Sequence, residues 1–219
     1  LASGQAVLTR RQKELGVLLI DFGFGTTSMI VYEENKILHG KSFPIGFRHL
    51  TNDIAIGLKI SIEIAEKIKL KYGHALARDI SRREMINLGE FDSSNTNEIP
   101  RRFLAEIIEI RLVELLDLIN NELKSLGRNI QLPAGIVVTG GGVKLNGVTD
   151  LVRQVLKLPV QMGLPDLSGF EVLNPSHAEM IDDPEFSTAV GLVLLGKNGE
   201  KKATGFLDPI IRVFKNIVP

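Results

Sequence analysis

Apolar runs in the first fifth of the chain predict three adjacent β-strands. Residues 16–22 are almost wholly apolar and have the length and β-branched content of a buried strand. Residues 28–32 and 37–43 form two further runs on either side of the polar turn Glu33-Glu34-Asn35-Lys36. Short turns between such runs join antiparallel neighbours, so the three segments predict an antiparallel meander. A helix is expected ahead of it, over residues 1–15.

Helical periodicity replaces the strand pattern after the meander. Apolar residues recur every three or four positions over residues 47–58 and again over residues 61–72. The strongest repeat runs from residue 100 to residue 127 and predicts one long amphipathic helix. Between these helices, residues 85–88 allow a short strand and residues 92–98 form a polar loop.

Strands and helices alternate in the last third of the chain. A short buried strand is expected over residues 135–138, then a helix over 147–156 and a strand over 159–162. A helix over residues 184–195 follows, and residues 196–205 have the composition of a polar linker. Buried strands that alternate with helices indicate an α/β fold.

Composition excludes several classes of protein. The chain has 219 residues, with 26 Lys and Arg against 26 Asp and Glu, so no net positive field would attract nucleic acid. We therefore expect no nucleic-acid partner. The absence of cysteine excludes disulfides and thiolate metal sites. Because the chain opens on Leu1 rather than Met, we expect it to be a piece of a longer protein.

The first candidate site is the glycine-bearing hairpin between the first two strands. Gly23 and Gly25 would let the backbone approach an anion closely, and the hydroxyls of Thr26 and Thr27 would add donors. Asp21 could hold a metal-bound water. Taken alone, the pattern favours an ordinary turn in which Asp21 is a cap.

The second candidate site is the run Gly140, Gly141 and Gly142, which follows a buried strand and precedes a helix. Ligands in open α/β folds bind at the carboxyl ends of strands, and three glycines leave a flat backbone surface for a nucleoside. No Gly-Lys-Ser or Gly-Lys-Thr follows, so the run is not a Walker loop, and it lacks the dinucleotide spacing. A plain strand-to-helix turn explains it equally well in isolation.

The third candidate site is the pair Glu66 and Lys69, which lie three apart and so on one helix face. A carboxylate there could accept ribose hydroxyls, and an ammonium could lie along a nucleotide. Glu63 and Lys67 form a similar pair on the same helix, and most such charges are simply solvated.

The order of these motifs resembles the second half of actin-like ATPases. That resemblance implies an α/β actin-like, ribonuclease H-like domain that binds ATP and Mg²⁺. It assigns phosphate contacts to the hairpin, with Asp21 reaching Mg²⁺ through water, ribose contacts to Glu66 and Lys69, and adenosine contacts to the glycine run. The phosphate-side residues implied are Asp21, Gly23, Gly25, Thr26 and Thr27.

Within that superfamily the chain resembles the FtsA family of bacterial cell-division proteins over nearly its whole length. The residues that carry the resemblance are 14–17, 43–46, 51–58, 65–69, 101–102 and 104–109. Phe24 departs from the pattern because similar proteins usually have a third glycine there, and Ser28-Met29 stands where Asp is common. A bulky side chain at position 24 would narrow the phosphate pocket.

The resemblance also implies how the chain is divided. Residues 1–46 and 129–197 would form one subdomain with the nucleotide loops, and residues 47–128 an inserted α+β subdomain. Residues 198–219 would form a linker and a terminal amphipathic helix. Actin-like proteins bind nucleotide between two halves, so this half alone would not be competent for catalysis, and hydrolysis would be weak at most.

Partner sites follow from the same resemblance. Arg101 and Arg102 would bind the carboxyl-terminal tail of the tubulin-like FtsZ, since paired arginines can grip a carboxylate. Without the family context, two exposed arginines on a helix explain them. The chain would also assemble into filaments, and its terminal helix would lie on the membrane through Phe206, Leu207, Ile210, Ile211, Phe214 and Ile217. A last helix packed on the domain would show the same pattern.

The expected function is therefore to anchor FtsZ filaments to the cytoplasmic face of the membrane at the division septum. Two alternatives stay open from the residues. One is another actin-like scaffold, of the pilus-assembly or MreB type. The other is a sugar or acetate kinase, which would need a catalytic carboxylate in the missing half.

Overall fold

The computed structural model describes residues 1–92, 97–127, 131–168, 170 and 181–203. Its centre is a five-stranded sheet in the order β3-β2-β1-β6-β7. The antiparallel meander that the sequence predicted forms one half of this sheet, and two parallel strands form the other. The strands are β1 (Val17–Phe22), β2 (Thr27–Glu33), β3 (Lys36–Phe43), β6 (Ile136–Thr139) and β7 (Val160–Met162).

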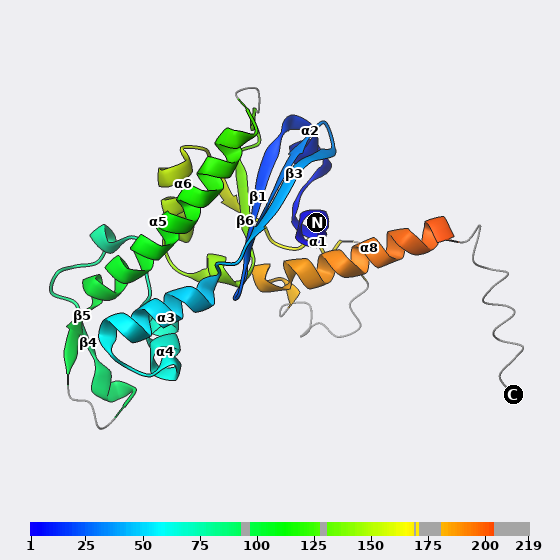
Figure 1. Ribbon diagram of the computed structural model, residues 1–219. Helices are drawn as coiled ribbons and strands as arrows, with labels where there is room; N and C mark the ends of the chain where they lie inside the picture. The colour runs from blue at the N-terminus through cyan, green and yellow to red at the C-terminus, as the bar shows by residue number, and fades with distance from the viewer. Residues whose placement is uncertain (93–96, 128–130, 169, 171–180, 204–219) are drawn as a thin grey trace, which may run out of the picture.

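Helices cover both faces of the sheet (Figure 1). On one face lie α5 (Arg101–Ser125) and α6 (Val148–Leu156), while α1 (Ala2–Val7) and α8 (Ser187–Ala203) lie together on the other. The remaining helices are α2 (Arg10–Leu15), α3 (Phe47–Leu58), α4 (Ile62–Tyr72) and short 3₁₀ turns at Ala77–Asp79, Leu88–Glu90, Gly141–Lys144 and Pro184–Phe186.

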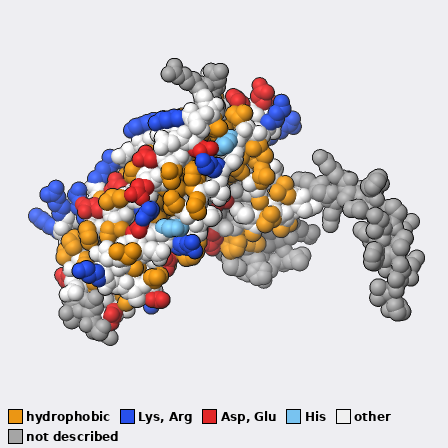
Figure 2. Space-filling view, in the orientation of Figure 1, with side chains coloured by type: hydrophobic (Ala, Val, Ile, Leu, Met, Phe, Trp, Pro, Cys, Tyr) orange, Lys and Arg blue, Asp and Glu red, His pale blue; other side chains and the backbone are white. Residues whose placement is uncertain are grey.

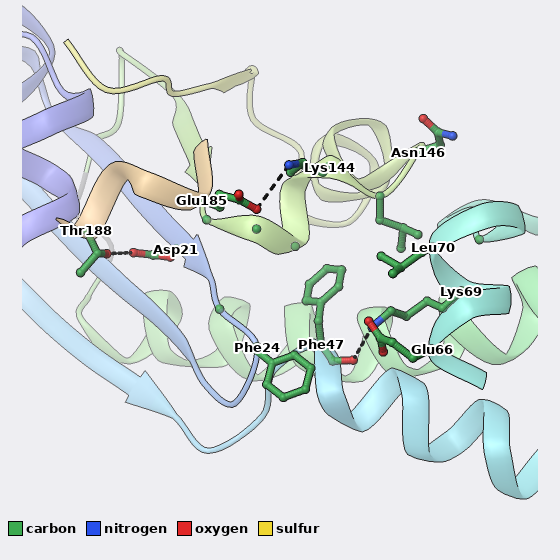
Figure 3. A pocket seen from close by; sticks show the side chains of 16 residues that line it. Asp21, Phe24, Phe47, Glu66, Lys69, Leu70, Lys144, Asn146, Glu185 and Thr188 are labelled. Carbon is green, nitrogen blue, oxygen red and sulfur yellow. Dashed lines mark hydrogen bonds and ion pairs between the residues drawn. The ribbon is translucent and has the colours of Figure 1, made fainter. Parts of the chain in front are cut away.

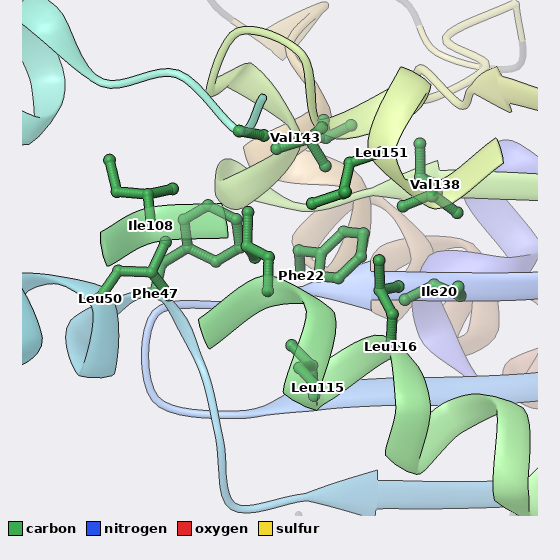
Figure 4. Close-up of a cluster of buried hydrophobic side chains, with 14 of the residues drawn as sticks. Ile20, Phe22, Phe47, Leu50, Ile108, Leu115, Leu116, Val138, Val143 and Leu151 are labelled. Carbon is green, nitrogen blue, oxygen red and sulfur yellow. The ribbon is translucent and has the colours of Figure 1, made fainter. Parts of the chain in front are cut away.

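Successive side chains of a strand point to opposite faces of the sheet, and this explains why a hydrophobic cluster lies on each face. Leu18, Ile20 and Phe22 of β1 point toward the larger cluster, which α3, α4, α5 and α6 complete (Figure 4). Val17 and Leu19 point the other way, into a smaller cluster that Leu8 closes. All five of these β1 side chains are at most 1% exposed. The strand is buried on both faces, which is why it reads as a continuous apolar run.

Residues between α3 and α5 add a second, smaller sheet, although Ile68 and Ile86 of this segment pack into the larger core. A two-stranded antiparallel ribbon pairs β4 (Met85–Asn87) with β5 (Glu98–Pro100). The sequence pattern predicted β4 but interpreted Glu98 as loop, because three residues are too few to show a period. Pro100 is the N-cap of α5 rather than part of its first turn.

Two further expectations need correction. The predicted helix over residues 1–15 is two helices, because Thr9 caps α2 with a capping box: the N–H of Gln12 donates to Thr9 Oγ1, and the N–H of Thr9 donates to Gln12 Oε1. The predicted linker at 196–205 is helical as far as Ala203, since Lys, Glu and Ala favour helix. The predicted membrane helix at residues 206–219 lies outside the described residues.

The surface mixes both signs of charge. Figure 2 shows basic and acidic side chains interspersed over the visible face, with hydrophobic side chains among them. This agrees with the equal totals of basic and acidic residues in the sequence.

Candidate functional site

The hairpin after β1, helices α3 and α4, the glycine run after β6 and the start of α8 meet at one cavity of about 680 Å³ (Figure 3). This volume lies within the range of about 300–1,000 Å³ that is usual for small-molecule sites. Most of the residues that the sequence assigned to nucleotide line it: Asp21, Gly23, Glu66, Lys69, Gly140, Gly141 and Gly142. Gly25, Thr26 and Thr27 are not among the lining residues.

Sheet topology brings the two glycine loops together. Strands β1 and β6 are parallel neighbours, and Asp21 at the end of one is in register with Thr139 at the end of the other. The hairpin after β1 and the glycine run after β6 therefore leave the sheet at the same edge. This is the edge at which open α/β sheets bind ligands.

The three glycines of the run differ in what their surroundings allow. A Cβ on Gly140 would lie 2.4 Å from Asp21 Oδ1, and the residue has a φ of +88°. A Cβ on Gly142 would lie 2.3 Å from the ring of Phe47. The nearest atom to a Cβ on Gly141 is the Cβ of Glu185, at an ordinary 3.7 Å. Packing therefore requires the first and third glycines, while the middle one faces open space in the cavity.

The hairpin is fastened to the start of α3. The N–H of Phe47 donates to the carbonyl of Gly23 at 3.0 Å, and the N–H of Arg48 donates to the carbonyl of Phe24 at 2.8 Å. A Cβ on Gly46 would lie 2.5 Å from the nitrogen of Thr26, so only glycine permits this close approach. These bonds satisfy free N–H groups of the helix and hold the hairpin backbone in place.

The two threonines of the hairpin have different environments. Thr26 is exposed, whereas Thr27 is fully buried and its hydroxyl has no hydrogen-bond partner among the described residues. Thr27 pairs across the sheet with Phe22 and Phe43, both of the larger core. Thr27 does not line the cavity, and the phosphate contact expected of it stays a prediction.

Lys69 is a buried structural cation rather than a free one. Its residue is 4% exposed, and its Nζ donates to Glu66 Oε2 at 2.7 Å, to Thr51 Oγ1 at 2.9 Å and to the carbonyl of Phe47 at 3.4 Å. An ammonium has three donors, so all are used. Thr51 also donates to Glu66, whose side chain remains 33% exposed at the cavity. Both residues of the predicted ribose pair line the cavity, but only Glu66 keeps hydrogen-bonding capacity for a ligand, because the three donors of Lys69 are used.

Asp21 lies near the carboxyl end of the central strand β1 and accepts a hydrogen bond from Thr188 Oγ1 at 2.9 Å. Thr188 belongs to α8, which no pattern in the sequence associates with the hairpin. In the described part of the chain, no group of three or more His, Cys, Asp or Glu side chains could hold a metal ion. A metal at Asp21 would therefore need ligands from the nucleotide and from water.

Several lining residues were not predicted from the sequence. Phe47, Leu70 and Gly73 come from α3 and the end of α4, and Lys144, Leu145 and Asn146 directly follow the glycine run. Most of these residues lie close in sequence to a predicted motif, so their position along the chain could have indicated that they line the same cavity. Glu185 and Thr188 had none, because only tertiary packing brings residues more than 40 positions away to the glycine run.

Lys144 is held by two carboxylates at the cavity rim. Its Nζ lies 2.7 Å from Asp183 Oδ2 and 3.3 Å from Glu185 Oε2. The hydrogen bond to Asp183 raises the pKa of Lys144, despite some opposing burial. Burial raises the pKa of Asp183, but the hydrogen bonds from Lys144 and from the N–H of Glu185 outweigh it and leave that pKa below its ordinary value.

The described lining of the cavity has more acidic than basic residues. The described lining includes three acidic residues, Asp21, Glu66 and Glu185, and two basic ones, Lys69 and Lys144, both in ion pairs. An anionic ligand would therefore meet backbone amides rather than an unpaired lysine of the described lining. Because the lining has one more acidic than basic residue, it would repel a nucleotide with a bound divalent cation less than a bare polyphosphate.

The two arginines at the start of α5 also differ. Arg101 donates from Nη1 to Glu84 at 2.7 Å and from Nε to the carbonyl of Tyr72 at 3.0 Å, so it fastens α5 to the neighbouring segments. The hydrogen bond from Arg101 Nη1 lowers the pKa of Glu84. Arg102 makes a looser contact with Glu106, at 3.3 Å, and lines a surface hollow of about 360 Å³ with Arg82, Pro100, Phe103 and Glu106.

Comparison with solved structures identifies the fold. The chain superposes on MreB5 of Spiroplasma citri bound to ADP with a TM-score of 0.69 at 16% identity, covering 93% of this chain and 60% of that one. A protein of a PilM–PilN type IV pilus biogenesis complex matches with a TM-score of 0.59 at 24% identity, covering 85% and 47%. The chain therefore has an actin-like α/β fold, as the sequence predicted.

Comparison with curated proteins identifies the family. The family model described as "Cell division protein FtsA" matches residues 18–191. The FtsA of Pseudomonas aeruginosa is 38% identical over 90% of this chain and 46% of its own length, and that of Escherichia coli is 34% identical over 91% and 49%. This chain thus spans less than half the length of these relatives.

No helix within the described ranges is both long and apolar enough to cross a membrane. The family-model match, the identity to FtsA proteins over most of the chain and the actin-like fold all agree. This chain belongs to the FtsA family of cell-division proteins.

Proposed function

We propose that this chain supplies one wall of an ATP site in an FtsA-type division protein. The observation that supports the proposal is the convergence of the hairpin, the glycine run and Glu66 on one cavity. Related folds occur in a protein whose structures are described as bound to ADP and to AMPPNP. The other wall would come from the part of the protein that this chain does not span.

The adenosine would lie against Gly141, the one glycine of the run with open space in front of it. Glu66 would accept the ribose hydroxyls, because its carboxylate is held by Lys69 and Thr51 and still reaches the cavity. Backbone amides of the hairpin near Gly25 and Thr26 would face the phosphates. Mg²⁺ would neutralise phosphate charge, with Asp21 as its nearest carboxylate through water.

Substitution of Gly141 by Glu in the full-length protein tests the nucleotide site. The new carboxylate would enter the cavity beside Glu185 and exclude adenosine by bulk and by charge, so calorimetric ATP binding should be lost. Gly196→Glu is the matched control, because Gly196 also has open space around it and does not line the cavity. Normal ATP binding by Gly141→Glu, with the fold intact by circular dichroism, would contradict the proposal.

For the FtsZ tail we propose the hollow around Arg102 as the docking point. Arg102 and Arg82 offer positive charge beside Phe103, which is 42% exposed, whereas Arg101 is engaged with Glu84. In a titration with an FtsZ tail peptide, Arg102→Glu should weaken binding on the order of tenfold, as expected for loss of a charged hydrogen bond. Arg78→Glu, an exposed arginine outside the hollow, is the control. Equal affinity for all variants would exclude this site.

We further propose the two remaining roles of the family resemblance, assembly into filaments and attachment to the cytoplasmic face of the membrane at the division site. Residues 1–46 and 129–197 would act as one subdomain, and residues 47–128 as an inserted one. The helix expected over residues 206–219 would have an apolar face that includes Ile211 and Phe214. Vesicle flotation should be lost when both become Asp, and retained flotation would refute the anchor. Sedimentation with ATP tests assembly.

A further inference from the structure

A second cavity lies next to the nucleotide cavity, and two residues separate them. It has a volume of about 540 Å³ and is lined by the starts of α3 and α4, including Arg48, Asn52 and Ile62. Phe24 and Glu66 line both cavities. They therefore form the boundary between the two spaces.

The two boundary residues differ in how they are held. The carboxylate of Glu66 receives hydrogen bonds from Lys69 and Thr51 and belongs to a fixed polar cluster. The backbone of Phe24 is fixed by its bond to Arg48, but its residue is 66% exposed. Among the described aromatic residues, Phe22 pairs with Phe47, and no ring pair includes Phe24. The carboxylate of Glu66 is therefore held in place by hydrogen bonds, whereas the exposed ring of Phe24 is not. Figure 3 shows both side chains at the cavity.

An aromatic ring at this place is a poor neighbour for phosphate. It has no donor for an anion, its face carries negative partial charge, and burying a phosphate against it costs solvation without a compensating hydrogen bond. The adenosine end of the cavity, at Gly141, lies on a different loop and does not depend on this ring. The free-energy cost of placing phosphate beside the ring of Phe24 therefore rises with the number of phosphates in the nucleotide.

We infer that Phe24 is a specificity-determining residue that makes the site discriminate against the terminal phosphates of a nucleotide. The inference rests on the proposed nucleotide site. It predicts a pocket that binds adenosine mono- and triphosphate with similar affinity, because the ring offsets the favourable interactions that each added phosphate would make. Removing the ring joins the two cavities and lets the terminal phosphates reach the amides of the hairpin and the guanidinium of Arg48.

The test compares the full-length protein that contains this chain with its Phe24→Ala and Phe24→Leu variants by calorimetric titration with AMP, ADP and ATP in the presence of Mg²⁺. Phe24→Ala should raise the affinity for ATP on the order of tenfold, the effect of gaining one charged hydrogen bond. Its affinity for AMP should change less than about twofold. Phe24→Leu should give an intermediate ATP-to-AMP ratio.

Ile110→Ala is the control, since Ile110 is 62% exposed and lines neither cavity. An ATP-to-AMP ratio that is the same in wild type and Phe24→Ala, with AMP still bound, would overturn the role of Phe24 and leave the nucleotide site standing. Failure of every variant to bind any adenine nucleotide would overturn both.

Discussion

The two glycine loops at the cavity look alike in the sequence but are constrained in different ways. In the run after β6, Gly140 and Gly142 are enclosed by Asp21 and by the ring of Phe47. In the hairpin after β1, a Cβ on Gly25 would meet no atom within 4 Å. The run is a packed wall, and the tip of the hairpin is open.

The difference shows that a glycine motif combines two requirements. Some of its glycines permit close packing, and others leave room for a ligand. A count of glycines cannot separate these roles, because the contact that decides each one comes from a distant segment. Three measurements test whether the two loops differ in this way.

The largest effect is expected when a methyl group is added to each loop in turn. Gly142→Ala should lower the free energy of unfolding by about 3 kcal/mol, because its Cβ would overlap the buried ring of Phe47. Gly25→Ala should change it by less than about 1 kcal/mol, since nothing lies near. Urea denaturation measures both. Equal losses would mean that the two loops are packed alike.

A smaller effect is expected from the two threonines of the hairpin. Thr27→Val replaces a buried hydroxyl without a described partner by a methyl group, so the protein should become about 1 kcal/mol more stable with unchanged nucleotide affinity. Thr26→Val, at the exposed tip, should keep its stability and lose roughly two- to tenfold in nucleotide affinity. Thermal denaturation and calorimetry distinguish them. A loss of affinity in Thr27→Val would place its hydroxyl at the ligand.

The smallest effect concerns the ion pair that closes the rim of the glycine run. The pKa of Lys144 is raised, so its contribution to stability is present below its ordinary pKa and is lost as pH rises through the raised value. The pKa of Asp183 is lowered, so its contribution is present above its ordinary pKa and is lost as pH falls through the lowered value. The pair therefore stabilises the fold between about pH 4 and about pH 10.

The stabilisation is small because Lys144 has a half-exposed side chain and solvent screens the pair. Lys144→Met should cost less than about 1 kcal/mol at pH 7, and the difference from wild type should shrink toward pH 3. Urea denaturation at several pH values measures it. A difference that stays constant across this range would show that the loss is apolar packing and not charge.

Most strands and helices of the fold could be predicted from local features of the sequence, whereas the actin-like fold and the FtsA family were expected from the resemblance of particular residue runs. The apolar run of β1, the meander that follows it and the long repeat of α5 each lie within one segment. The two glycine loops could be located for the same reason, since glycines that directly follow a strand are visible within a short stretch of sequence. The limits of α8 and the second strand of the ribbon could not, because short or glycine-containing segments show no clear period.

Tertiary structure alone decided which residues of those motifs are available to a ligand. Lys69 looked like a free cation, but Thr51 and Phe47 on a neighbouring helix use its remaining donors. Thr27 looked like a phosphate ligand, but strand pairing directs it into the core. The sequence determined the elements and the order of the loops. Contacts between distant segments determined which side chains remain exposed, because burial depends on what packs opposite each residue.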